Sequence, residues 1–320
     1  MKLTALDKAS RIAIRDCMGT QKNESVLIVT DELKRKIGYN LYKNSLALGY
    51  ESLYVEMKSK EMHGVEPPKQ VAELMKMFDV VLCPTTKSLT HTNARREASA
   101  LGARIATFPG ITEDVMIRGL NADYKKIAAL TIKLTDILTN TNIIRVTAAN
   151  GTDITMDISS RRGYSSKGLF HAKGESGNLP TGEAYIAPLE GKSNGVFVVD
   201  GSMAGIGVIK NKPIKFVVQD GFAVEISGGS QADKLNNILN SYDMSARNIA
   251  EFGIGTNDKA KLSGLLLEDE KVMGTIHIAI GDNKSMGGNV NVPIHLDGVV
   301  KKPTVYFDGQ IIMKNGKLLI

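Results

Sequence analysis

The sequence predicts an α/β domain, with a parallel sheet and flanking helices, followed by a β-rich α+β domain. Two observations support this division. Up to about residue 140, short apolar segments typical of buried strands alternate with helical segments, which is the pattern of βαβ units and a mainly parallel sheet. Beyond that point, strand-like segments punctuated by glycines predominate. We therefore expect an α/β domain over residues 1–140 and a β-rich domain over residues 141–320.

The first domain begins with the apolar segment 25–30, a buried-strand pattern that precedes a lysine-containing helix ending near Leu48. A second strand is expected at 79–83, and a helix over 94–101 leads into a third strand at 103–107. The chain has no GxGxxG after the first strand and no GxxxxGK[ST]. It therefore lacks the glycine-rich loops that usually bind nucleotide phosphates.

The second domain opens with a predicted hairpin, because segments 143–147 and 153–158 flank the turn dipeptide Asn150-Gly151. Further strand-like segments follow at 195–200, 205–210, 215–219 and 223–227. A helix is expected over 230–242, where apolar residues recur at helical spacing and form one core-facing stripe. The end of the chain contains the turn dipeptides Asp308-Gly309 and Asn315-Gly316, which predict terminal hairpins.

Composition excludes several classes of function. The 320 residues are 42% hydrophobic and 23% charged, as in an ordinary soluble protein, and no apolar run approaches the roughly 18 residues that cross a membrane. The net charge of +6 comes from scattered lysines without interleaved aromatic residues, so no nucleic-acid partner is expected. The N-terminus does not resemble a secretory signal, and the two cysteines, Cys17 and Cys83, form no CxxC motif. These features predict a cytoplasmic protein without disulfides.

Two histidines and an aspartate near the end of the chain have the spacing of a metal site. His295 and Asp297 form a His-x-Asp pair, and an extended segment points both side chains to one face because strand side chains alternate. His277 lies in segment 274–281, where isoleucines take alternate positions, so its ring is expected on the face opposite to the isoleucines. Together these side chains predict a metal site.

Two glutamates add carboxylates in apolar surroundings. Glu183 follows a bend fixed by Pro180 and Gly182, and Glu251 lies among small and apolar residues. A carboxylate in such a segment is costly to bury unless it is paired or bound to a metal. The structural alternatives are packed strand histidines, a local hydrogen bond between His295 and Asp297, a strand-edge charge at Glu183, and an ion pair between Glu251 and Arg247.

Ligands that offer nitrogen and oxygen without sulfur suit zinc, cobalt, manganese or ferrous iron. Two histidines with three carboxylates exceed the needs of one catalytic zinc, and they are sufficient for two ions about 3.5–4 Å apart. The same set is compatible with one iron held by His277, His295 and Asp297, with the glutamates outside its ligand shell.

Two further histidines are candidates for substrate binding. His91 follows an expected strand end, where ligand crevices of α/β sheets form; the alternative is a helix N-terminal residue capped by Ser88 or Thr90. His171 lies in the glycine-rich loop before Glu183, and it either lines a cavity or is exposed.

Four segments, in this order, resemble the signature of the thermophilic metallo-aminopeptidases typified by aminopeptidases T and S. They are 178–183 (Asn-Leu-Pro-Thr-Gly-Glu), 251–255 (Glu-Phe-Gly-Ile-Gly), 274–281 (Gly-Thr-Ile-His-Ile-Ala-Ile-Gly) and 294–297 (Ile-His-Leu-Asp). Segments 88–95 and 102–111 of the first domain add to the resemblance, which therefore spans nearly the whole chain.

The resemblance implies a catalytic β-rich domain, two divalent ions (zinc, cobalt or manganese) and a homodimer. The implied metal ligands are Glu183, Glu251, His277, His295 and Asp297. A metal-activated water would attack the carbonyl of a peptide or small-molecule substrate, with Glu183 or Glu251 as general base and acid. The favoured hypothesis is thus a metallo-aminopeptidase, a hydrolase that removes N-terminal residues from peptides.

One departure favours a different enzyme. The aminopeptidases have a metal-site tyrosine seven residues past the first ligand histidine, where this chain has Lys284. The same superfamily includes 2,5-dihydroxypyridine dioxygenase, a ring-cleaving enzyme with one Fe(II) on two histidines and an aspartate, and His277, His295 and Asp297 are similar to that triad. The alternative hypothesis is therefore a non-haem Fe(II) dioxygenase. A third is a binding protein that keeps the fold but holds no metal.

Overall fold

The computed structural model describes residues 2–320, which divide into two compact units. The N-terminal unit comprises the chain up to Ala128 together with Ser166–Thr181, and the C-terminal unit comprises Ala129–Ser165 and Gly182–Ile320. Sequence analysis places one boundary near residue 140, whereas the chain passes between the units three times. The physical reason is strand β8 (Ser176–Asn178), which pairs in parallel with β4 (Arg104–Thr107) and so adds to the N-terminal sheet.

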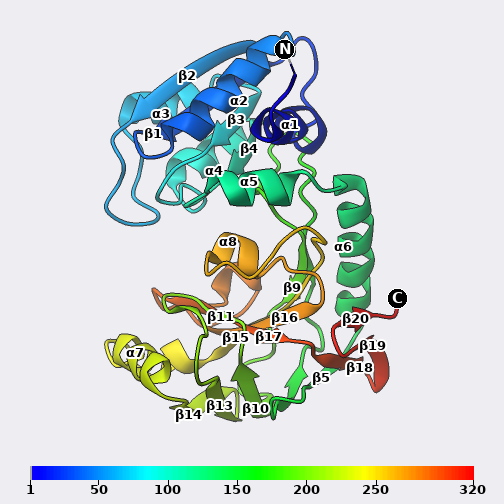
Figure 1. The fold of residues 1–320 in the computed structure, drawn as a ribbon. Helices are drawn as coiled ribbons and strands as arrows, with labels where there is room; N and C mark the ends of the chain where they lie inside the picture. The colour runs from blue at the N-terminus through cyan, green and yellow to red at the C-terminus, as the bar shows by residue number, and fades with distance from the viewer. Residues whose placement is uncertain (1) are drawn as a thin grey trace. The chain divides into compact units, whose positions relative to one another are not determined.

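The N-terminal unit is the predicted α/β fold, with helices around a five-stranded parallel sheet of order β2-β1-β3-β4-β8 (Figure 1). The other strands are β1 (Ser25–Asp31), β2 (Glu51–Met57) and β3 (Val80–Cys83). The helices are α1 (Ala5–Arg11), a π-helical segment (Ile12–Cys17), α2 (Arg35–Ala47), α3 (Lys69–Met75), α4 (Asn93–Ala100) and α5 (Glu113–Leu120). The strands and helices expected up to residue 107 are thus confirmed within a few residues at each end.

Helices cover both faces of this sheet, since its central strands β1, β3 and β4 are buried along almost their whole length. On one face, Leu27 and Val29 of β1 share a hydrophobic core with α3 and α4. On the other face, Gly38 of α2 lies directly against Thr30 of β1, where a Cβ would be 2.7 Å from the threonine Cβ. Glycine at this position therefore lets helix and strand approach closely.

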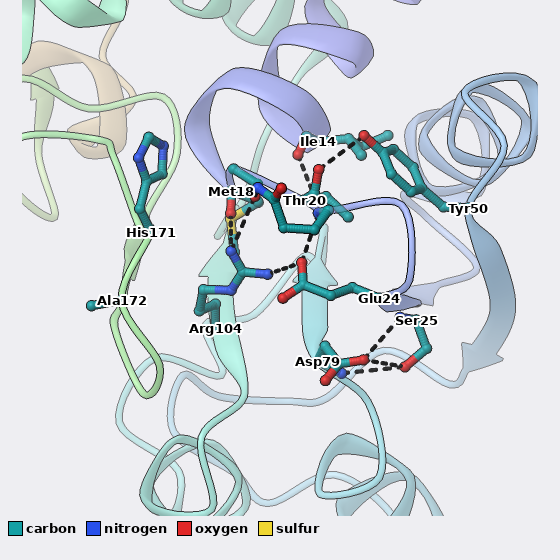
Figure 2. A network of polar contacts seen from close by, with 12 residues as sticks. Ile14, Met18, Thr20, Glu24, Ser25, Tyr50, Asp79, Arg104, His171 and Ala172 are labelled. Atoms are coloured by element: carbon teal, nitrogen blue, oxygen red, sulfur yellow. Dashed lines mark hydrogen bonds and ion pairs between the residues drawn. The ribbon is translucent and has the colours of Figure 1, made fainter.

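The buried guanidinium of Arg104, on β4, ties the segment after the π-helical turn to the sheet (Figure 2). Its Nη1 donates a hydrogen bond to the carbonyl oxygen of Met18 at 2.7 Å, and its Nη2 forms an ion pair with Glu24. Tyr50 donates its hydroxyl to the carbonyl oxygen of Thr20 at 3.0 Å. These bonds satisfy backbone groups that no regular element pairs.

The C-terminal unit contains two sheets whose strand pairs are antiparallel (Figure 1). The eight-stranded sheet has the order β14-β13-β10-β6-β5-β18-β19-β20, and the seven-stranded sheet has the order β12-β11-β17-β16-β15-β9-β7. The first comprises β5 (Ile143–Thr147), β6 (Asp153–Asp157), β10 (Ser193–Val199), β13 (Ile214–Gln219), β14 (Phe222–Ser227), β18 (Thr304–Phe307), β19 (Gln310–Lys314) and β20 (Lys317–Leu318). The second comprises β7 (Tyr164–Ser166), β9 (Glu183–Ile186), β11 (Ser202–Met203), β12 (Gly207–Val208), β15 (Ile249–Gly255), β16 (Thr275–Gly281) and β17 (His295–Lys301).

The helices of this part are α6 (Tyr124–Thr139), which begins in the N-terminal unit, α7 (Ser230–Leu239) and α8 (Leu266–Asp269). Short 3₁₀ turns lie at Met244–Arg247 and Lys284–Met286. The predicted hairpin at residues 143–158 is confirmed by the β5–β6 pairing, and the predicted terminal hairpins are β18–β19 and β19–β20. Their turn residues Asp308-Gly309 and Asn315-Gly316 all have positive φ, as tight hairpin turns require.

One hydrophobic core joins the two sheets, and it determines which face of each strand is left for polar residues. Phe197 and Phe216 of the eight-stranded sheet stack with ring centroids 4.2 Å apart, and Phe252 and Ile278 of the seven-stranded sheet belong to the same core. Because strand side chains alternate, the neighbours of those core residues point to the opposite face. Residues such as Glu251 and His277 are therefore directed away from the core.

Among residues 2–320, no helix is both long enough and apolar enough to span a bilayer.

Asp7 joins α1 to α2 through a buried carboxylate. It accepts hydrogen bonds from the backbone N–H and hydroxyl of Thr4 and from the amides of Asn40 and Asn44, at 2.7–3.0 Å. Lys43 Nζ lies 2.9 Å from it. The donors Asn44, Lys43 and Thr4, in that order, hold the pKa of this carboxyl well below its ordinary value.

We expect Asp7→Ala to lower the free energy of unfolding of the N-terminal unit at pH 7 by about 2–3 kcal/mol, because it removes the acceptor that the amides of Asn40 and Asn44 share with Lys43. The folded pKa is depressed, so this stabilisation is present above the ordinary carboxyl pKa of 3.8 and is lost as pH falls below it. Urea unfolding of wild type and variant should therefore show a difference that shrinks below pH 4. The exposed carboxylate of Glu61 provides the control, since Glu61→Ala should change little; equal effects of the two variants would contradict the assignment.

Candidate metal centre

Four neighbouring strands of the seven-stranded sheet present all five predicted ligand residues on one face. In the β15–β16 pair, Gly253 lies opposite His277, and in the β9–β15 pair Gly255 lies opposite Glu183. The β16–β17 pair places Ala279 opposite Asp297 and Gly281 opposite His295. Glu251 has the same parity as Gly253 and Gly255, so it shares their face. Because side chains alternate along each strand, the isoleucines face the core and the acids and imidazoles share the opposite face of the sheet.

Glu251 lies between the two imidazoles. Its Oε1 is 3.2 Å from Nε2 of His277, and its Oε2 is 3.2 Å from Nε2 of His295. Nε2 of His295 is in turn 3.4 Å from Oδ1 of Asp297. Glu183 lies at the other end, with Oε2 3.7 Å from Nε2 of His277.

The side chains that converge as three ligands are Glu251, His295 and Asp297, whose ligand atoms all lie within 4.8 Å of one another. This differs from the triad of His277, His295 and Asp297 considered from the sequence. The reason is geometric. Nε2 of His277 contacts Oε1 of Glu251, whereas His295 contacts Oε2, so the carboxylate of Glu251 lies between the two rings.

The orientation of His295 fits a metal ligand. Its Nδ1 lies 2.7 Å from the carbonyl oxygen of Asp282, and this contact requires the proton on Nδ1. A metal ion that displaces the proton from Nε2 would then find its lone pair aimed at the site, as in metal sites where a carbonyl fixes the other ring nitrogen. One imidazole and two carboxylates, without sulfur, form a donor set for zinc, manganese, cobalt or iron.

The buried carboxylates of this cluster stabilise positive charge on the two imidazoles. Burial opposes the charged form of His277, but the adjacent carboxylates of Glu251 and Glu183 outweigh it and raise its pKa to about 9. Burial likewise opposes a charged His295, whose pKa is nevertheless raised by Asp297 and Glu251. The same contacts lower the pKa of Glu251 and Asp297 against the effect of burial. Protons on the imidazoles balance the carboxylates here, and a divalent ion supplies equivalent charge.

Sequence analysis missed Gly253, on which the position of His277 depends. A Cβ at residue 253 would lie 2.0 Å from Nε2 of His277, so the imidazole rests directly on the glycine backbone. A glycine inside an otherwise apolar strand is the signal that points to such a close approach.

Lys271 and Glu270 are also part of the cluster and were missed. Nζ of Lys271 is 2.7 Å from Oε2 of Glu183 and 2.5 Å from Oε2 of Glu270. The lysine is only 3% exposed. The burial of Lys271 could not be predicted from its neighbours in the sequence, because it follows a run of acidic residues that is typical of an exposed helix end.

Lys284, which stands where the aminopeptidases have a tyrosine, is exposed in the loop between β16 and β17. Its backbone N–H contacts Oδ1 of Asp282 at 3.3 Å. Within residues 2–320, no ion pair joins the side chain of Lys284 to any of the five candidate ligands.

The two histidines predicted to bind substrate belong to the N-terminal unit. His171 is exposed, its Nε2 lies 2.9 Å from the carbonyl oxygen of Asp16, and its ring lies directly against Gly19. His91 is exposed just before α4. A role of either residue in substrate binding stays a prediction.

Comparison with known proteins gives a consistent family. The model of the 2,5-dihydroxypyridine 5,6-dioxygenase family matches residues 2–320. The curated 2,5-dihydroxypyridine 5,6-dioxygenase of Pseudomonas putida KT2440 is 23% identical over 253 residues, which cover 73% of this chain and 69% of the relative.

Two solved structures share the fold. The 2,5-dihydroxypyridine dioxygenase from Pseudomonas putida KT2440 aligns over 99% of this chain and 98% of its own, with a TM-score of 0.84 and 17% identity. Wild-type AmpT from Thermus thermophilus aligns over 99% of both chains, with a TM-score of 0.69 and 16% identity.

These findings correct the favoured hypothesis of the sequence analysis. The assignments as aminopeptidase, metalloprotease and hydrolase are wrong, because the family model and the curated relative both name a dioxygenase. The resemblance to metallo-aminopeptidases reflects a fold shared with AmpT. The chain belongs to the 2,5-dihydroxypyridine 5,6-dioxygenase family.

Proposed function

We propose that the protein is a non-haem Fe(II) dioxygenase that opens the ring of a dihydroxylated pyridine. The observation that carries this proposal is the family match over residues 2–320. The convergence of Glu251, His295 and Asp297 supports it, because an oxygenase of this kind needs a metal ion with open coordination positions.

Glu251, His295 and Asp297 would hold the ion. They supply one imidazole and two carboxylates, whereas the common arrangement in non-haem iron oxygenases is two histidines and one carboxylate. When bound, ferrous iron supplies the electron chemistry that dioxygen needs to react with an aromatic ring.

The surrounding residues orient these ligands. The carbonyl of Asp282 fixes the ring of His295, and His277 donates from Nε2 to Oε1 of Glu251, which leaves Oε2 directed at His295. We assign His277 a positioning role because its side chain is only 1% exposed, whereas that of His295 is 31% exposed. Substrate and dioxygen would therefore reach the site from the side of His295.

The function is tested by loading the purified chain with Fe(II) under anaerobic conditions and adding 2,5-dihydroxypyridine in oxygenated buffer. We expect the pyridine absorbance to disappear with uptake of one oxygen molecule per ring, since a dioxygenase consumes both oxygen atoms. Metal-free protein is the control and should show no uptake. An iron-loaded chain that consumes no oxygen with any dihydroxypyridine isomer would rule the proposal out.

The ligand assignment is tested by His295→Ala and Asp297→Asn. Each should weaken Fe(II) or Co²⁺ binding by more than about a hundredfold, because removing one of three protein ligands costs more than the roughly 10–100-fold typical of an outer-sphere change. Metal content after gel filtration and calorimetric titration measure the effect. His63→Ala, which changes an exposed histidine remote in sequence, should bind metal like wild type; unchanged binding in His295→Ala would show that the ion lies elsewhere.

Gly253→Ala should displace the ring of His277 and, through it, Glu251. We expect metal affinity to fall by about tenfold or more, as when an outer-sphere partner is lost. The double variant Gly253→Ala/His277→Ala removes the collision, so it should be no worse than His277→Ala alone. If the losses of metal affinity in the two single variants add up in the double variant, Gly253 and His277 act independently and the prediction is wrong.

A further inference from the structure

Lys271 is a buried lysine at the edge of the metal centre, and the proposed reaction does not use it. Its side chain is 4% exposed, and its ammonium lies 2.7 Å from Glu183 and 2.5 Å from Glu270. The backbone around it is fixed, since its N–H donates to the carbonyl of Glu268 at 3.0 Å and its own carbonyl accepts from Asn257 N–H at 2.9 Å. The ammonium is therefore held in one place.

The two carboxylates that hold the ammonium are linked to the candidate ligands. Oε2 of Glu183 is 3.7 Å from Nε2 of His277, which contacts Glu251. The side chain of Glu270 lies beside that of Asp297. A second metal ion beside the first would therefore use Glu183 and Glu270, and these oxygens already surround a cation.

An ammonium and a metal ion cannot share this position. A divalent ion needs carboxylate oxygens at about 2.0–2.2 Å, and like charges a few ångströms apart repel strongly where water is excluded. A buried lysine, in turn, remains charged only while carboxylates accompany it. Each of the two cations thus excludes the other.

We propose that Lys271 supplies the charge of a second metal ion, so that the wild-type chain binds one divalent ion and a neutral residue at position 271 opens a second metal site at Glu183 and Glu270. This inference rests on the proposed function, because it takes Glu251, His295 and Asp297 to hold the first ion. It replaces the two-ion centre expected from the count of ligands in the sequence.

The test is the metal stoichiometry of the full chain. Metal-free wild type, Lys271→Met and Lys271→Arg are titrated with Co²⁺ by calorimetry and visible absorption, and bound cobalt is counted after gel filtration. We expect one ion per chain for wild type and for Lys271→Arg, which keeps the charge. Lys271→Met should bind two, with the second at least tenfold tighter than any second ion on wild type.

Lys259→Met is the matched control, because Lys259 lies nearby in sequence, is 51% exposed and pairs with Asp258 at 2.9 Å. It should bind one ion. If Lys271→Met does not fold without metal, it should fold when produced with Co²⁺, since the second ion then supplies the missing charge. Two ions on wild type, one ion on folded Lys271→Met, or failure of that variant to fold even with Co²⁺ would each overturn the inference.

These outcomes separate the inference from the proposed function. A wild-type chain that binds one ion but consumes no oxygen with dihydroxypyridines would contradict the function and leave the role of Lys271 standing. A chain that opens the ring while binding two ions would contradict only the role of Lys271.

Discussion

The candidate metal centre depends on one electrostatic constraint: carboxylates fixed on a buried sheet face must be matched by positive charge. Glu183, Glu251 and Asp297 are each less than a tenth exposed, and the pairing of β9, β15, β16 and β17 prevents them from separating. Two imidazoles and an ammonium accompany them within 4 Å. This requirement explains the raised pKa of both histidines and the persistence of a charged lysine despite its burial.

Local patterns were sufficient to predict many of the strands, although not β2 or β8, and the side on which His277, His295 and Asp297 lie. The alternation in residues 274–281 correctly separates His277 from the isoleucines of the core, because the period of two is a property of any extended segment. The His-x-Asp spacing places His295 and Asp297 on one face for the same reason. Those predictions need no knowledge of which strands pair.

Contacts between distant segments could not be read from the sequence. The position of Glu251 between the imidazoles follows from the register of β15, β16 and β17, and Lys271 reaches Glu183 across almost ninety residues of chain. The choice between hydrolase and oxygenase also failed. The same five acids and imidazoles suit either reaction, and the one local signal for an oxygenase, Lys284 in place of the aminopeptidase tyrosine, was outweighed by the four matching segments.

The return of residues 166–181 to the N-terminal sheet has a consequence for biosynthesis. Strand β8 is the fifth strand of that sheet, but it is made only after β5, β6 and β7 of the other unit have left the ribosome. Until then β4 is an open edge with unpaired backbone groups, the kind of edge that recruits foreign strands. The N-terminal unit can therefore be completed only after part of the other unit has been made, and a gene cut at any single position would deprive one of them of its own residues.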